Sequence, residues 1–383
     1  MVDNPYLQSV DRRTVLKTLG AGGVTLTAGC LGDDSGTSQA EDVTFDLSAI
    51  QPDELVGQGP FGEDPSPADS VALSDSEEDS IADGDYTIEV VFHFREDTWT
   101  QLQETAITNR CSELGINITG IHYAEFDPEI QSNILESVAG KNNVDGILSI
   151  PVDIEATRDA YLSVSESGKE IVFMDNVPSN FEHLTDYAGV VAADNRGMGV
   201  IGGRMMESLL DSGKIILLEH DVPFYVTNER YLGIREVLEE NDDFELETVG
   251  FIEPGNVLPT AQNTLSANPD ATGLWAPWVD PPGAQAVQAI NEQGMNIPVT
   301  SCDVGERSGT LLAERSPLKG VGSQDPLAQG LAEVNMIAKR FLGEETPPYI
   351  ALPATAVARQ NLLETYPDLV GEEPPASITS HFE

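Results

Sequence analysis

Apolar residues follow two alternating patterns between residue 86 and about residue 342. Short continuous apolar runs, such as 87–94, are typical of buried strands, and segments with helical spacing follow them. The first helical segment places these apolar residues on one face: Leu102, Ala106, Ile107, Cys111 and Leu114. Strands that alternate with helices indicate parallel sheets built from strand–helix–strand units.

The alternation divides into two series. In the first series we predict strands at 87–94, 116–121, 145–150, 170–174 and 189–192, and helices at 102–114, 128–141 and 154–167. In the second series we predict strands at 214–219, 246–252, 272–276, 297–302 and 318–323, and helices at 196–209, 227–240, 257–267, 283–293, 310–314 and 327–342. Two such series predict an α/β protein with two doubly wound parallel-sheet lobes.

The first thirty residues contain an export pattern. The pair Arg12-Arg13 precedes a short apolar run at 18–28, and Thr27-Ala28-Gly29-Cys30 follows. This order resembles a twin-arginine signal that ends in a lipoprotein box, with Cys30 as the lipidated first residue after removal of 1–29. The apolar run is far shorter than the roughly 20 residues that span a bilayer. We therefore expect a lipid anchor on the outer face of the cytoplasmic membrane; the alternative is a disordered basic N-terminus with a chance cysteine.

The chain is strongly acidic, with 65 acidic and 19 basic residues and a formal net charge of −46. Such a charge weakens a compact fold in dilute buffer through self-repulsion. In molar salt the screening length falls to about 3 Å, and most of the repulsion disappears. The composition therefore predicts adaptation to very high salt, as in halophilic archaea, although an ordinary acidic protein stays open. Nucleic acid is not an expected partner, because binding it needs a basic surface.

Residues 30–85 combine low apolar content with charge of one sign. Sixteen acids and no Lys or Arg occur between residues 31 and 85. Such a composition cannot offset the entropy lost on ordering, so we predict a disordered tether. Local folding of 43–55, which has a few apolar residues, stays open.

The cysteines and histidines give no sign of a metal or cofactor. Cys111 lies in a helical pattern and Cys302 at a strand end, so we interpret both as small buried residues. No C-x-x-C or H-x-x-x-H spacing is present, and the five histidines are scattered. We predict a protein without a cofactor or a bound metal.

Polar and aromatic residues gather just after the predicted strands. In doubly wound sheets, ligands bind outside the carboxyl ends of the strands. Carboxylates and amides can each bond a pair of hydroxyl groups, and an indole can cover the apolar face of a sugar ring. This combination suits a neutral polyhydroxylated ligand. The candidate residues at the strand ends are Asp97, Trp99, Asp175, Asn176, Asn228, Trp278, Asp303 and Gln324.

Structural roles stay open for several of these residues. An Asp after a strand is often a helix cap, which is an alternative for Asp97 and Asp303. Trp99 has packing as an alternative, and the two asparagines have turns or caps. Trp275 lies inside a strand and is expected in the core, and Asp194-Asn195 is expected to cap a helix or form part of a hinge.

The order of motifs over residues 86–358 resembles the type I periplasmic binding proteins, the ribose- and galactose-binding group that serves sugar ABC transporters. The segments that carry the resemblance are Leu114-Gly115, Val144-Asp145-Gly146-Ile147, Ile171-Val172-Phe173-Met174-Asp175, Ala193-Asp194-Asn195, Glu229-Arg230-Tyr231-Leu232-Gly233, Asn268-Pro269-Asp270-Ala271, Cys302-Asp303 and Gly322-Ser323-Gln324-Asp325-Pro326.

The resemblance implies two lobes joined by a multi-strand hinge. It implies a first lobe of 86–192 plus 324–349, a second lobe of 193–323 plus 350–365, and a polar tail at 366–383. It also implies ligand contacts at every strand-end candidate named above and adds His93 as a further one. Asn176 and Asn228 stand where this family commonly has arginines, and Trp278 where it has an Asn. An amine-bearing ligand, a flatter ring or a nucleoside therefore stays open beside a sugar.

The leading hypothesis is a monomeric, membrane-tethered receptor that is not an enzyme. It would capture a small polar solute, expected to be a sugar or similar polyol, by lobe closure and deliver it to the permease subunits of an ABC importer. A receptor for signalling or taxis stays open. A transcription regulator of the lactose-repressor type shares the fold, but residues 1–85 offer no basic DNA-binding motif. An exported enzyme is less favoured, because no nucleophile, metal or phosphate-loop motif is present.

Overall fold

The first of two six-stranded sheets is entirely parallel. The computed structural model describes residues 43–95, 98–222 and 224–382. The strand order of this sheet is β11-β5-β4-β3-β1-β2. Its strands are β1 (Thr87–Phe92), β2 (Asn117–Tyr123), β3 (Gly146–Ser149), β4 (Glu170–Met174), β5 (Gly189–Ala193) and β11 (Tyr349–Leu352).

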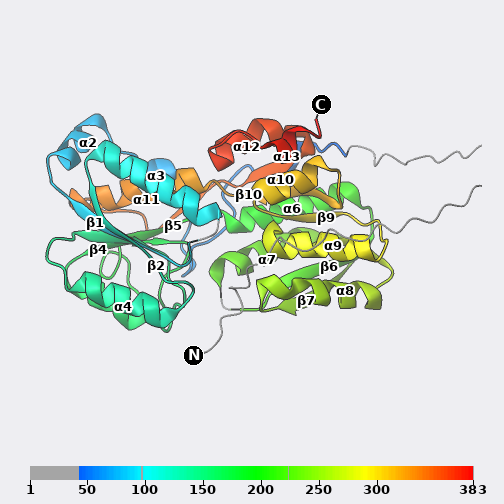
Figure 1. The fold of residues 1–383 in the computed structure, drawn as a ribbon, viewed down its shortest axis with the longest axis horizontal. Helices are drawn as coiled ribbons and strands as arrows, with labels where there is room; N and C mark the ends of the chain where they lie inside the picture. The colour runs from blue at the N-terminus through cyan, green and yellow to red at the C-terminus, as the bar shows by residue number, and fades with distance from the viewer. Residues whose placement is uncertain (1–42, 96–97, 223, 383) are drawn as a thin grey trace, which may run out of the picture. The chain divides into compact units, whose positions relative to one another are not determined.

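Helices cover both faces of this sheet. Figure 1 shows α3 (Thr98–Leu114) and α11 (Pro326–Phe341) on one face and α4 (Pro128–Ala139) on the other. Helix α5 (Arg158–Glu166) packs against α4. Helices α4 and α11 begin with the same local sequence pattern. Asp127 and Asp325 accept hydrogen bonds from backbone N–H groups of the first turns, and a proline follows each at the first helical position.

The second sheet has the order β12-β10-β9-β8-β6-β7. Its strands are β6 (Gly213–His220), β7 (Phe244–Phe251), β8 (Ala271–Trp275), β9 (Val299–Cys302), β10 (Leu318–Ser323) and β12 (Thr355–Ala358). The last strand runs antiparallel to β10, and the other neighbours are parallel. Its helices are α6 (Asn195–Leu209), α7 (Tyr225–Leu238), α8 (Val257–Ala267), α9 (Ala284–Glu292), α10 (Glu306–Ala313), α12 (Leu362–Val370) and α13 (Ala376–Thr379).

The predicted fold class is confirmed, because each half is an α/β lobe built on a doubly wound sheet. The two strand orders match position by position, so β4 of the first sheet corresponds to β9 of the second. Shorter helices complete the fold: α1 (Leu47–Ile50), α2 (Asp75–Ala82), η1 (Ala68–Val71), η2 (Pro254–Asn256), η3 (Val279–Gly283) and η4 (Arg359–Asn361). Trp275 is fully buried in β8, and Asp194 caps α6, as predicted.

The chain passes between the two sheets three times, after β5, after β10 and after β11. The predicted boundary at residue 349/350 is wrong, because Ile350 pairs with Val191 inside the first sheet. The chain passes from the first sheet to the second after Leu352. Only two residues separate β11 from β12, so the run 349–358 gives no visible break in the sequence.

The prediction of a disordered tether is wrong over residues 43–85. We call residues 43–66 the N-terminal strap. Phe45 and Ile50 enter the core beneath α6, and Ser66 forms a bridge to Ile350 of β11. Beyond the strap, Val71 and Ile81 are fully buried in the core of the first lobe. A few well-placed apolar residues therefore order a segment whose average composition is typical of disorder.

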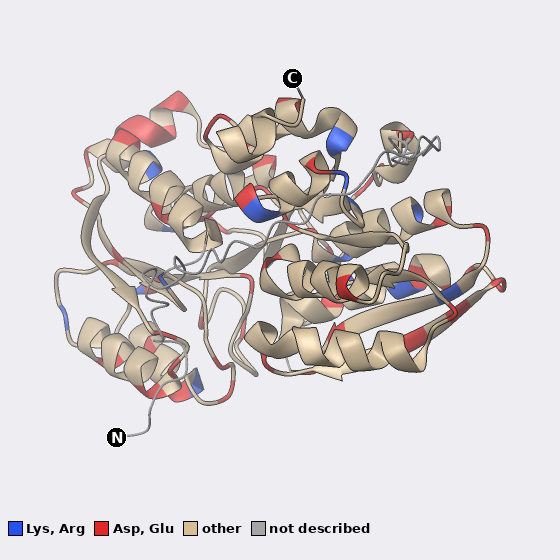
Figure 2. Ribbon diagram, turned by 45° about the vertical axis from the view of Figure 1, so that its right-hand side comes forward, with Lys and Arg blue, Asp and Glu red and all other residues tan. Residues whose placement is uncertain are grey.

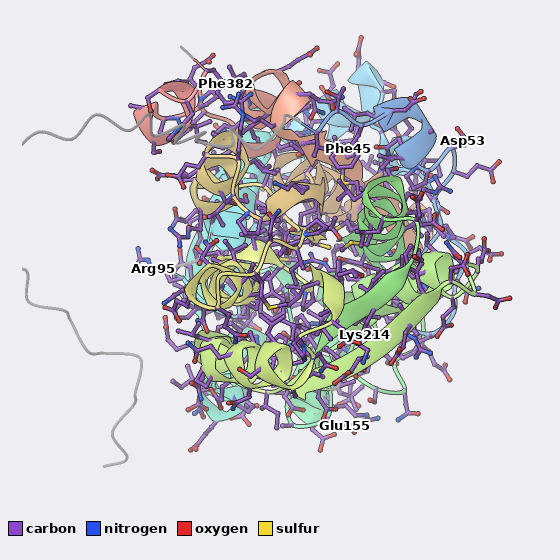
Figure 3. The ribbon with its side chains drawn as sticks, turned by 90° about the vertical axis from the view of Figure 1, so that its right-hand side faces the viewer. Phe45, Asp53, Arg95, Glu155, Lys214 and Phe382 are labelled. Carbon is purple, nitrogen blue, oxygen red and sulfur yellow. The ribbon has the colours of Figure 1, made fainter. Side chains whose placement is uncertain are left out.

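The strap passes over the first connection between the sheets. The backbone N–H groups of Val56 and Gly57 donate to the carboxylate of Asp194, at 2.8 and 2.9 Å. A Cβ on residue 57 would lie 3.0 Å from Asp194 Oδ1, so glycine permits this approach. The hydroxyl of Tyr225 on α7 donates to the carbonyl of Gln58, and it lies 3.4 Å from the hydroxyl of Tyr349. Figure 3 labels two side chains of the strap, the buried Phe45 and the exposed Asp53.

The C-terminal segment is also ordered, so the predicted polar tail at 366–383 is wrong over residues 366–382. Tyr366 and Ile378 are buried in the core of the second lobe. Acidic positions are spread over both lobes and outnumber the basic ones (Figure 2). Within the described residues, no helix is long and apolar enough to cross a membrane.

Candidate functional site

Two aspartates occupy equivalent positions at the carboxyl ends of the two sheets. Asp175 follows β4 and Asp303 follows β9. Both have left-handed backbone conformations, with φ of 56° and 74°. Residues other than glycine rarely adopt this backbone conformation, and those that do are often found at functional sites. The pair therefore marks the edge where the site is expected.

Asp303 is held by two donors, Arg230 of the second lobe and Gln324 of the connection that follows β10. One carboxylate oxygen accepts from Nη1 of Arg230 at 2.7 Å, and the other accepts from Nε2 of Gln324 at 2.8 Å. Arg230 lies on α7 and also donates through Nε to Asn195 at 2.9 Å. The structure thus brings Asp303 and Gln324 together and places the guanidinium of Arg230 beside Asp303, and the roles of Asp303 and Gln324 as ligand contacts stay predictions.

Arg230 keeps its charge although it is buried. Burial alone lowers the pKa of its guanidinium, and the neighbouring Asp303 carboxylate outweighs that effect, so the pKa is raised. The arginine is only 3% exposed, and Nη1 also donates to the carbonyl of Pro277 at 3.1 Å. These hydrogen bonds fix the guanidinium of Arg230 within the second lobe.

Asp175 has a different environment. It is 6% exposed and accepts a hydrogen bond from Nε2 of Gln329 on α11 at 3.2 Å. Burial raises the pKa of Asp175 to about 7; Arg230 and Gln329 oppose the rise, and Asp303 adds to it. The charges of the second-lobe ion pair therefore act on Asp175.

A second buried carboxyl group lies behind Asp175. Glu333 of α11 is fully buried and accepts from Nε2 of Gln103 on α3 at 3.4 Å. Burial, and then the charge of Asp175, raise the pKa of Glu333 well above its usual value. Burial therefore favours the neutral form of Glu333, which avoids a second buried charge.

Two side chains of the first lobe have buried polar atoms with unused hydrogen-bonding capacity. The side chain of Asn176 is 1% exposed, and neither its Oδ1 nor its Nδ2 has a partner within the described part of the chain. The indole Nε1 of Trp99 is also buried and has no hydrogen-bond partner in that part of the chain. Buried polar atoms are nearly always hydrogen-bonded, so these atoms are suited to hold a bound solute.

Comparison with known proteins identifies the family. The family described as the periplasmic binding protein domain matches residues 88–345, which is more than half of the chain. The chain belongs to the periplasmic binding protein family. The family's members bind solutes and work outside the cytoplasm. The match begins after the N-terminal strap and ends before β11.

Relatives of this periplasmic binding protein are distant. A proposed rhizopine-binding protein of Rhizobium meliloti is 25% identical over 241 residues, which are 61% of this chain and 77% of that one. The solved structure of an Agrobacterium vitis ABC transporter solute-binding protein with bound tagatopyranose has 17% identity and a TM-score of 0.66, covering 76% of this chain and 99% of that one. A glucose-galactose binding protein of Geobacillus stearothermophilus has 16% identity and a TM-score of 0.65, with coverage of 73% and 99%. These likenesses to solved structures show the fold.

The aromatic candidates of the binding protein lie in two groups. His93 and Trp99 contact each other in the first lobe, with ring centres 5.6 Å apart. Trp278 packs in the second lobe against His220 and Phe251, at 5.2 and 5.8 Å. Trp278 therefore joins an aromatic cluster at the ends of β6 and β7, and its role as a pocket wall stays a prediction.

For the remaining candidates, the structure gives no contact that tests their predicted roles. Asn228 is exposed, and its side chain makes no hydrogen bond within the described residues, so its role also stays a prediction. Asp97, Cys30, Arg12 and Arg13 lie outside the described residues. Both Cys111 and Cys302 are free and buried, as predicted. No group of three or more metal-binding side chains forms in the described parts of the chain.

Sequence reasoning missed the polar residues that support Asp175. Gln329 and Glu333 are four residues apart on a helix whose buried face is otherwise largely apolar. Gln103 of α3 faces them and is fully buried as well. Polar residues at helical spacing within an apolar stripe were the available signal, because burying them is costly unless they have partners.

Proposed function

We propose that this periplasmic binding protein captures a small polyhydroxylated solute between its lobes and passes it to a membrane importer. The observation that carries the proposal is the Asn176 side chain, a buried amide with a free donor and a free acceptor beside Asp175. Hydroxyl groups match both functions of an amide, since each can donate and accept.

Because the candidate contacts come from both lobes, solute binding should favour the closed form of the protein. Asp175 and Asn176 belong to the first lobe, and Asp303 and Arg230 to the second. A solute that contacts all of them binds the closed form more tightly than the open form, and this difference shifts the population toward closure. Charge-assisted hydrogen bonds contribute about 1.5–3 kcal/mol each. Four or five, less the ordering costs, reach the roughly −8 kcal/mol of micromolar binding.

The relatives support a sugar or polyol as the solute. Solved structures of similar fold contain D-fucose, D-arabinose and D-allose in proteins from Agrobacterium and Actinobacillus species. Their lobes have the fold of this chain, and the cluster around Asp303 offers carboxylate, amide and guanidinium groups that can bond hydroxyl groups.

A thermal-shift screen in molar salt tests the proposal. The panel contains pentoses, hexoses, polyols, nucleosides and amino acids, and calorimetry follows every hit. Asp303→Ala should weaken binding of the sugar or polyol hit more than tenfold, because it removes an anchor of Gln324 and the counter-ion of Arg230. The matched control is Asp53→Ala, an exposed acid of the strap (Figure 3). A hit only among amino acids, or equal effects of the two variants, would overturn the proposal.

We further propose that a lipid on Cys30 tethers the receptor to the membrane. The Arg12-Arg13 pair and the tetrapeptide that ends at Cys30 support export followed by lipidation. Cys30→Ser should move the protein from the membrane fraction to the soluble fraction of its native host. Continued sedimentation of this variant with membranes would refute the anchor.

A further inference from the structure

The candidate site has more negative than positive groups. Asp303 uses both carboxylate oxygens on Arg230 and Gln324. Asp175 has a hydrogen bond from a neutral amide but no ion pair with any described Lys, Arg or His. Arg95 does not supply the missing charge, because its guanidinium lies over the ring of Tyr123, 4.9 Å from the ring centre. A buried carboxylate without its own cation is costly.

We propose that the solute carries a protonated amine, which forms an ion pair with the Asp175 carboxylate while hydroxyl groups of the same molecule bond the Asn176 amide. This inference rests on the proposed function and specifies the class of solute for that site. An ammonium group offers three donors, so it can pair with Asp175 and still donate to a neighbouring oxygen.

The groups around Asp175 make this pairing responsive to pH. Arg230 and Asp303 of the second lobe act on it by charge, and Gln329 and Glu333 of α11 lie behind it. Burial also raises the pKa values of Tyr225 and Tyr349, so both phenols stay neutral. Burial raises the pKa of Asp175 to about 7, so a cation bound beside it changes how many protons this carboxyl holds near neutral pH.

An amine and a neutral hydroxyl group have opposite effects on this titration. A cation beside Asp175 favours its ionised form, so binding an amine expels the proton that the carboxyl holds below pH 7. The cost of removing that proton falls as the pH rises. With a pKa near 7, the affinity for an amine that stays protonated over this range should increase about tenfold from pH 6 to pH 8. A neutral sugar accepts a hydrogen bond from the protonated carboxyl and releases no proton.

Calorimetry with matched pairs of compounds tests the inference on the full chain in molar salt. The pairs are D-glucosamine with D-glucose, D-galactosamine with D-galactose, and an aminocyclitol with the corresponding cyclitol. Each titration is run at pH 6 and pH 8 in two buffers with different ionisation enthalpies, which gives the number of protons released. The inference expects at least one amine to bind more than tenfold tighter than its neutral partner at pH 8, with proton release at pH 6.

Three variants assign the effect to a residue. Asp175→Asn should lose both the amine preference and the proton release. Glu333→Gln should keep the proton release, because the proposed ion pair forms at Asp175 and burial favours the neutral form of Glu333. Asp53→Asn is exposed and should match the wild type.

The outcomes separate the inference from the proposed function. Tighter binding of neutral compounds, or amine binding without proton release, would overturn the inference and leave the proposed function standing. Binding by no sugar, polyol or amine in either the pairs or the wider screen would overturn both.

Discussion

Replacing Val71 by alanine tests whether the acidic segment before β1 is part of the folded domain. Val71 is fully buried in the core that also contains Ile88 and Val90 of β1. The substitution removes two methyl groups, each of which contributes about 0.8 kcal/mol through burial. The cavity left behind adds a further cost, since packed cores relax only in part, so the total loss of stability is about 2–3 kcal/mol.

Val56→Ala is the matched control, because it is the same change in the same acidic segment at a side chain that is 37% exposed. Surface substitutions usually change stability by less than about 0.5 kcal/mol. Urea unfolding in molar salt, followed by tryptophan fluorescence and circular dichroism, measures both variants. Similar midpoints for Val71→Ala and Val56→Ala would refute the reasoning and would support the disorder that composition alone predicts.

Three further predictions concern pH, thiols and salt. Burial raises the pKa of Asp175 to about 7 in the folded protein without solute, whereas the same carboxyl in the unfolded chain loses its proton near pH 4. The folded state therefore holds one more proton between these two pH values. The contribution of Asp175 to the free energy of unfolding is lost as the pH rises from about 4 to 7. Asp175→Asn should flatten that part of the urea stability profile, and an unchanged slope would argue against the assignment. Burial raises the pKa of Cys111 and Cys302 to about 12, so a thiol reagent at pH 8 should modify them only in urea; rapid labelling of the native protein would contradict their burial. The melting temperature should rise with salt into the molar range, whereas a flat response would remove the high-salt interpretation.

The sequence predicted the elements that local rules determine. Apolar runs and helical spacing identified the alternating strands and helices, and the rule that ligands bind at the carboxyl ends of strands identified Asp175 and Asp303. Both rules use only neighbouring residues. The equivalence of the two aspartates became visible once the strand orders were known.

Long-range packing accounts for what the sequence did not reveal. Gln329 contacts Asp175 across 154 positions, and periodicity gives a residue's helix face but not its partner. The burial of Val71 and Ile81 was hidden because composition averages over a segment, whereas folding depends on where its few apolar residues lie. The passage after Leu352 was misplaced because β11 and β12 form one nearly continuous apolar run.

A crystal structure with the solute found by the screen tests the central claim most directly. The account predicts a solute held by both lobes, with its polar atoms within hydrogen-bonding distance of Asn176 on one side and of the Asp303–Arg230 pair on the other. A solute bound to one lobe alone, with the Asn176 amide untouched, would contradict it.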